Sequence, residues 1–83
     1  MTWLEIIKRA FGSIGTELHL SEIYTRVFDI VDTECPEKRN NKTIESTIRG
    51  TLERFSEDSD AFGGEHCFSI TRGKGRGYWR RDN

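Results

Sequence analysis

The 83-residue sequence has little of what marks secreted, membrane-spanning or metal-binding chains. Its two cysteines, Cys35 and Cys67, can form at most one disulfide, and no CxxC or HxxxH pair supplies zinc-ligand spacing. No apolar run reaches the roughly 18 residues that a membrane span needs, and the first residues lack the basic-then-apolar order of a secretory signal. We therefore expect a cytoplasmic chain with reduced cysteines, no membrane partner, no metal and no cofactor.

Motifs that catalysis requires are also missing. Neither a nucleophile motif nor the residue order of a catalytic triad is present. The glycine-rich segment 73–77 contains no GK[ST] sequence, and too few residues follow it to form a helix, which excludes a phosphate-binding loop. We expect that the protein is not an enzyme.

The net charge of −1 conceals a strongly uneven distribution of charge. Residues 38–54 contain five cations and two anions, and residues 72–81 contain five cations and no anion. Between these two basic segments, residues 57–65 carry four anions and no cation. A chain with this distribution is expected to have one basic and one acidic face.

Hydrophobic periodicity predicts three helices. They are expected over residues 2–14, 21–31 and 42–56. Thr2 and Glu5 have the spacing of a capping box, and the first helix is expected to end before Gly15. Ser21 and Asn41 are candidate N-caps for the second and third helices. The polar segment between these two helices, which contains the only proline, is expected to be a loop.

A glycine-spaced basic loop near the C-terminus is the most informative segment. Alternating runs at 67–71 and 77–80 flank the loop 72–77 and predict a β-hairpin. The hairpin tip carries three cations and three glycines, and because glycine has no side chain, such a tip can approach a polyanion closely. Three helices followed by a basic hairpin predict a single α+β domain over residues 1–83. We expect this domain to be a winged helix, with a three-helix core plus a C-terminal β-hairpin wing, because three helices and a basic hairpin in this order are the layout of that fold.

The third helix has the composition of a DNA-contacting helix. The face opposite its apolar stripe carries small and basic side chains over the N-terminal half of the helix. Cations near a helix N-terminus oppose the helix dipole, unless a phosphate lies there. Gly50 costs about 1 kcal/mol relative to alanine within a helix, which either a closely approaching partner or a neighbouring element would explain. Glu53 is the exception on this face, and it could pair with Arg49.

Double-stranded DNA is the expected partner, with the third helix in the major groove. Arg49, Asn41 and Ser46 are candidates for hydrogen bonds to base edges. Gly50 is the position where the helix backbone can approach the partner. The expected phosphate contacts are Lys38, Arg39, Lys42, Arg54, Lys74 and Arg76. Arg72 is a candidate for insertion into the minor groove.

The alternative is a protein–protein interaction module, or a phage-type inhibitor that uses the acidic segment 57–65. Convergence of the helix and wing cations on one exposed face would favour DNA. Pairing of these cations with acidic residues would favour a protein partner. The acidic residues in question are Glu53, Glu57, Asp58 and Asp60. The near-zero net charge predicts weak binding by one copy, which favours a dimer or fusion to a nuclease or other effector domain.

Four segments carry a resemblance to known domains: Thr2–Ile7, Leu20–Tyr24, Ile44–Phe55 and Phe68–Trp79. Together they resemble the winged helices appended to bacterial and phage restriction-type endonucleases, and they are related to HARE-type helix-turn-helix domains. The resemblance implies a bacterial or phage source, a recognition third helix and a wing that touches DNA. Some members of this group bind modified bases, so the resemblance includes modified DNA among the expected targets.

Overall fold

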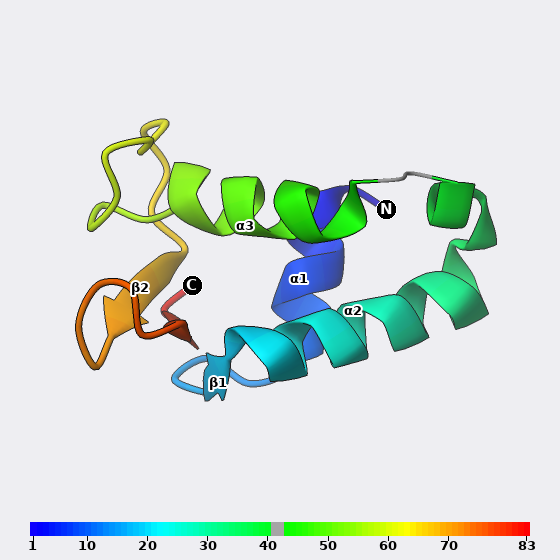
Figure 1. The fold of residues 1–83 in the computed structure, drawn as a ribbon, viewed down its shortest axis with the longest axis horizontal. Helices are drawn as coiled ribbons and strands as arrows, with labels where there is room; N and C mark the ends of the chain where they lie inside the picture. The colour runs from blue at the N-terminus through cyan, green and yellow to red at the C-terminus, as the bar shows by residue number, and fades with distance from the viewer. Residues whose placement is uncertain (41–42) are drawn as a thin grey trace.

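Three α-helices are the longest elements of the fold. In a computed structural model, which describes residues 1–40 and 43–83, they are α1 (Trp3–Phe11), α2 (Leu20–Glu34) and α3 (Ile44–Arg54). Figure 1 shows α2 and α3 on opposite sides of α1, with the C-terminal hairpin at one end of this pair. The short 3-10 helix η1 (Pro36–Asn40) lies at the other end.

Helix α1 begins with the predicted capping box and ends earlier than predicted. The Thr2 hydroxyl accepts from the Glu5 backbone N–H at 3.1 Å, and the Glu5 carboxylate accepts from the Thr2 N–H at 2.9 Å. The helix ends at Phe11 because Gly12, at φ +83°, leaves the helical conformation. The prediction that it continues to residue 14 is therefore wrong.

Helix α2 is longer than predicted and has a different cap. His19 is the N-cap, and its Nδ1 accepts from the Ser21 backbone N–H at 3.1 Å, so the prediction of Ser21 as the cap is wrong. The helix continues to Glu34, and Val31 and the C-cap residue Cys35 are buried. Much of the segment predicted to be a loop is therefore helical.

Helix α3 is two residues shorter at each end than the predicted range 42–56. Thr43 occupies the N-cap position. Asn41, the predicted cap, lies outside the residues that the structure describes. The apolar stripe was predicted to contain Ile44, Ile48, Leu52 and Phe55. The first three are buried as predicted, whereas Phe55 is the C-cap residue and is half-buried against the core.

The sheet has three antiparallel strands in the order β1–β3–β2. They are β1 (Glu17–His19), β2 (Phe68–Thr71) and β3 (Tyr78–Arg81). The predicted hairpin is confirmed to within one residue at each strand end. Trp79 is opposite Leu18 on one side and Ile70 on the other, and the central position of its strand leaves it only 9% exposed.

One hydrophobic core joins the helices to the sheet. Phe11 of α1 and Phe68 of β2 stack with ring centroids 5.4 Å apart. Cys35 and Cys67 are both buried and free, in agreement with the expectation of reduced cysteines. The fold is α+β, with β1 between the first two helices and the hairpin last, and this order is a winged-helix-like topology. The loop 72–77 between β2 and β3 is called the wing below.

Candidate nucleic-acid interface

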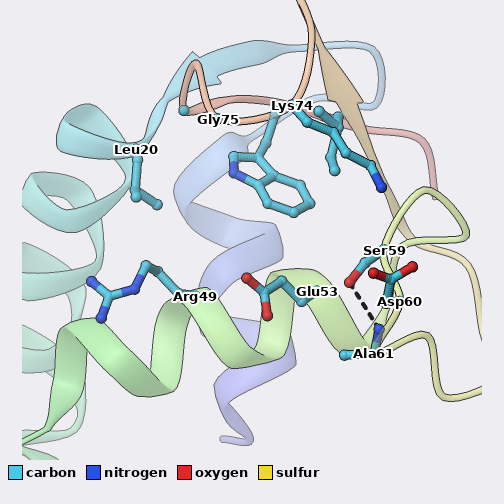
Figure 2. Close-up of a pocket in the computed structure, with 11 residues that line it drawn as sticks. Leu20, Arg49, Glu53, Ser59, Asp60, Ala61, Lys74 and Gly75 are labelled. Atoms are coloured by element: carbon cyan, nitrogen blue, oxygen red, sulfur yellow. Dashed lines mark hydrogen bonds between the residues drawn. The ribbon is translucent and has the colours of Figure 1, made fainter.

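The exposed ridge of α3 lies between grooves that the rest of the fold creates. The first, the wing groove, has a volume of about 460 Å³ and separates α3 from the wing and the start of α2. Its apolar residues are Leu20, Ile70 and Trp79. Its charged residues are Arg49, Glu53, Asp60 and Lys74. Figure 2 shows Arg49 and Glu53 rising from α3 on one side of this groove, and Lys74 entering from the wing on the other.

Two further grooves flank α3. The helix groove, of about 430 Å³, lies between α2 and the start of α3 and contains Phe28, Arg39, Ser46 and Arg49. The N-terminal groove, of about 490 Å³, lies between α3 and the start of α1. Trp3, Ser46, Gly50 and Arg54 are among its residues. Arg49 lines both the wing groove and the helix groove, and Arg54 lines the N-terminal groove, so the exposed ridge of α3 has an arginine on each flank.

Arg49 is held by neutral partners. Its Nη1 donates to the Tyr24 hydroxyl at 2.8 Å, and its Nη2 donates to the Ser46 hydroxyl at 3.3 Å. The suggested pair with Glu53 does not form, so that expectation is wrong. Neutral hydrogen-bond partners orient the guanidinium without cancelling its charge, which leaves Arg49 suited to binding an acceptor from outside the chain.

Gly50 has no neighbour over it. A Cβ built on this residue meets no atom within 4 Å, apart from the backbone of its own helix. The packing of a neighbouring element, one of the two explanations for this glycine, is therefore wrong. The cost of glycine in the helix has no explanation in the contacts of the described residues, whereas close approach of a partner would account for it.

Two of the predicted DNA contacts are already paired within the fold. The Arg39 Nε lies 2.8 Å from an Asp32 carboxylate oxygen, and its guanidinium lies over the Phe28 ring. Arg72 donates to Glu17 at 3.0 Å, and its guanidinium lies 4.4 Å from the centroid of the Tyr78 ring. Arg72 is therefore directed along the sheet, toward β1.

The remaining predicted cations among the described residues form no ion pair. Lys38 lies over the Trp3 ring, with its Nζ 5.1 Å from the centroid, and Arg54 lines the same groove as Trp3. Lys74 and Arg76 are exposed in the wing. Lys42, like Asn41, lies outside the residues that the structure describes. The cations thus do not neutralise the acidic segment, although Lys74 shares the wing groove with Glu53 and Asp60.

One wing glycine has a structural cause. Gly77 has φ +81°, and a Cβ on it would lie 2.9 Å from the His19 Nε2. Its carbonyl also accepts from the Leu20 N–H at 2.7 Å. Gly77 therefore fits the wing against the start of α2, and the contact with His19 explains this glycine without any partner.

The acidic segment folds back on the hairpin. The Asp58 carboxylate accepts from the Ile70 backbone N–H at 2.9 Å, and the Glu57 N–H donates to the His66 Nδ1 at 3.1 Å. Phe62, in the same segment, is 36% exposed. At least one of the four acidic side chains thus stabilises the edge of the sheet.

A polar cluster beside the hairpin was not found from the sequence. Asp82 accepts hydrogen bonds from Arg80 at 2.7 Å, from His66 at 2.8 Å and from Ser69. Partial burial alone would raise the pKa of Asp82, but the hydrogen bonds from Arg80, Ser69 and His66 outweigh it and lower the pKa to about 2.

The arrangement does not activate Ser69 as a nucleophile. The His66 Nδ1 accepts a backbone N–H from Glu57, so its Nε2 carries the proton that is donated to Asp82. The Ser69 hydroxyl donates to Asp82 as well. No lone pair of the imidazole is left to remove the serine proton, so His66 does not act as a general base toward Ser69 in this arrangement.

Comparison of the chain with known protein families, curated proteins and solved structures finds no match. No helix of the described part of the chain is long and apolar enough to cross a membrane. No group of three or more histidine, cysteine or carboxylate side chains that could hold a metal ion occurs among residues 1–40 and 43–83.

Proposed function

We propose that this protein is a double-stranded DNA-binding module. It places α3 in the major groove and the wing on the backbone or in the minor groove. The observation that carries the proposal is the ridge of α3, where Gly50 has open space above it and the charge of Arg49 is not cancelled by any acid among the described residues. The major groove admits an α-helix, and an arginine can hydrogen-bond O6 and N7 of guanine at once.

The cations on either side of α3 support this orientation. A helix in the major groove has a sugar–phosphate backbone along each flank. Lys38 and Arg54 lie toward the N-terminal groove, Lys74 lines the wing groove on the other side of α3, and Arg76 is exposed in the same wing. In the proposal, each pair contacts one backbone, and Lys42 is a further candidate for a phosphate contact.

Arg39 and Arg72 take smaller roles in the proposal. Their ion pairs with Asp32 and Glu17 are exposed, with 52% and 59% of the arginine side chains accessible. Exposed pairs contribute about 0–1 kcal/mol, and a phosphate must displace the carboxylate before it can bind, so each of these arginines adds less to DNA binding than an unpaired cation does. Ser46 orients Arg49 and lies on the same ridge, and Asn41 remains a candidate for base contact.

The proposal is tested by selecting bound sequences from a randomised duplex and comparing two arginine variants on the selected site. Arg49→Ala should cost about 1–3 kcal/mol on the selected duplex and much less on unrelated duplexes, because it removes a base contact. Arg54→Ala should weaken all duplexes alike, because it removes a phosphate contact. If both variants lose the same binding free energy on all sequences, Arg49 does not contact a base.

Modified DNA belongs in the same experiment. The resemblance to modification-dependent winged helices makes duplexes with modified cytosine or adenine natural competitors of the selected duplex. Preference for one modified duplex would place the protein with the readers of modified bases. Equal binding would show that these modifications do not contribute to recognition.

A second candidate function is a protein-interaction module, and the composition of the wing groove favours it. An apolar floor bounded by two cations and two anions suits a peptide segment better than a run of phosphates. Absence of binding to any duplex at low salt would make this candidate the first choice. If the protein is a DNA-binding module, dimerisation or fusion to an effector domain would raise its apparent affinity for DNA.

A further inference from the structure

Glu53 is an unpaired anion on the ridge of α3. It is exposed, it lies one helical turn after Arg49, and it lines the wing groove (Figure 2). No hydrogen bond or ion pair holds its carboxylate among the described residues. An unpaired carboxylate on a face that approaches phosphates weakens binding through like-charge repulsion, unless a donor from the partner compensates.

The major-groove edges of the four bases differ in whether they can supply that donor. An ionised carboxylate only accepts hydrogen bonds. Guanine presents two acceptors and thymine presents one, while adenine places the N7 acceptor beside its amino donor. Cytosine alone presents a donor, its N4 amino group, with no acceptor beside it.

We infer that Glu53 is a specificity-determining residue that accepts a hydrogen bond from the N4 amino group of a cytosine in the major groove. The inference rests on the proposed DNA-binding function. It gives the anion on the α3 ridge a role in the choice of sequence, at some cost in general affinity.

The spacing of Glu53 and Arg49 extends the inference to a short sequence. Four residues of α-helix rise about 6 Å, close to two base-pair steps of about 3.4 Å. Arg49 is suited to guanine and Glu53 to cytosine. The bound site is therefore expected to contain a guanine and a cytosine no more than about two base pairs apart.

Other charges in the wing groove bear on the same carboxylate. Lys74 and Asp60 line this groove together with Glu53, and neither forms an ion pair with it. Lys74 lowers the repulsion between Glu53 and a backbone nearby, whereas Asp60 adds to it. Discrimination between bases, rather than affinity alone, is therefore the property that reports on Glu53.

The test is the Glu53→Gln variant, with selection from a randomised duplex followed by titration of the four single-base variants of the selected site. Glutamine keeps the size of the side chain but can hydrogen-bond adenine N6 and N7 together. We expect the wild-type protein to prefer cytosine at one position by about tenfold and the variant to prefer adenine there. Asp29→Asn is the matched control, since Asp29 lies exposed on α2 and the change in net charge is the same.

The outcomes separate this inference from the proposed function. A change of preference at one position in Glu53→Gln, absent in Asp29→Asn, supports the role of Glu53. Unchanged base preference in a variant that still binds duplex overturns the inference and leaves the DNA-binding proposal standing. Failure of the wild-type protein to bind any duplex overturns both. Circular dichroism of each variant checks that the fold is retained.

Discussion

The Tyr24 hydroxyl accepts a hydrogen bond from the Nη1 of Arg49 at 2.8 Å. Tyr24 lies on α2 and Arg49 on α3, so this bond connects the second helix of the fold to an exposed arginine of the third. A guanidinium has five N–H donors in one plane, and fixing one of them fixes the direction of the rest. The wild-type protein therefore presents Arg49 in a restricted set of orientations before any partner arrives.

Replacing Tyr24 by phenylalanine tests whether this restriction matters for binding. Tyr24→Phe keeps the ring and removes the acceptor, so we expect an unchanged fold and a loss of about 1 kcal/mol in discrimination at the position that Arg49 contacts. Competition titration with selected and scrambled duplexes measures the effect. Tyr78→Phe is the control, because Tyr78 contacts His19 and Arg72 instead. Equal discrimination by both variants would show that Tyr24 does not position Arg49.

The open space above Gly50 leads to opposite predictions for stability and for binding. Gly50→Ala should raise the free energy of unfolding by about 0.5–1 kcal/mol, because alanine favours the helix and meets no neighbour. The same methyl group should weaken duplex binding about tenfold if the α3 backbone approaches DNA closely. Urea unfolding and fluorescence anisotropy measure the two effects.

A helix-stabilising change elsewhere provides the control for Gly50. Thr25→Ala, at an exposed position of α2, should raise stability by a few tenths of a kcal/mol and leave DNA binding unchanged. Retention of full affinity by Gly50→Ala would contradict close approach at the α3 ridge.

The wing cations are predicted to act as a pair. Replacing Lys74 and Arg76 together by alanine should lower the affinity for all duplexes. It should also reduce the magnitude of the slope of log K against log salt by about two units. Arg72→Gln should change the slope by less than one unit, because Arg72 is engaged with Glu17. Arg9→Gln, which breaks an exposed pair with Glu34 on α1 and α2, is the control outside the interface. An unaltered slope in the double variant would exclude the wing from the interface.

The polar cluster around Asp82 predicts a specific dependence of stability on pH. The pKa of Asp82 is about 2 in the folded protein against an ordinary 3.8, so its contribution is complete above about pH 5 and is lost as the pH falls toward 2. Asp82→Asn should lower the free energy of unfolding at pH 7 by about 2 kcal/mol, and this difference should shrink between pH 4 and pH 2. Urea unfolding across this range, with Asp29→Asn as the control, measures it. A difference that is constant with pH would contradict the assignment.

Hydrophobic pattern and turn residues were enough to predict the order of the elements. The apolar stripe of α3 and the alternation on either side of the wing are signals within single elements, and the structure confirms both. Errors occurred at the ends, where the outcome depends on tertiary contacts. His19 becomes the cap of α2 partly because Gly77 and Tyr78 pack against its ring.

The sequence was enough to predict which cations belong to the candidate site. It was not enough to predict which of them form ion pairs within the fold. Arg39 and Arg72 look like Lys74 in the sequence, yet their pairing with Asp32 and Glu17 depends on distances across the fold. The same applies to Arg49, whose partner Tyr24 is 25 residues away in the chain. The three wing glycines also look alike in the sequence. Only the contact with His19 shows that Gly77 has a structural role.

The most direct test of DNA binding is the affinity for a randomised duplex, measured by fluorescence anisotropy at several salt concentrations. With four or five phosphate contacts, log K should fall against log salt with a slope close to −4. A slope in this range, reduced by the Lys74 and Arg76 double variant, is the result that the proposed function predicts. Absence of binding at low salt, or binding that does not change with salt, would contradict it.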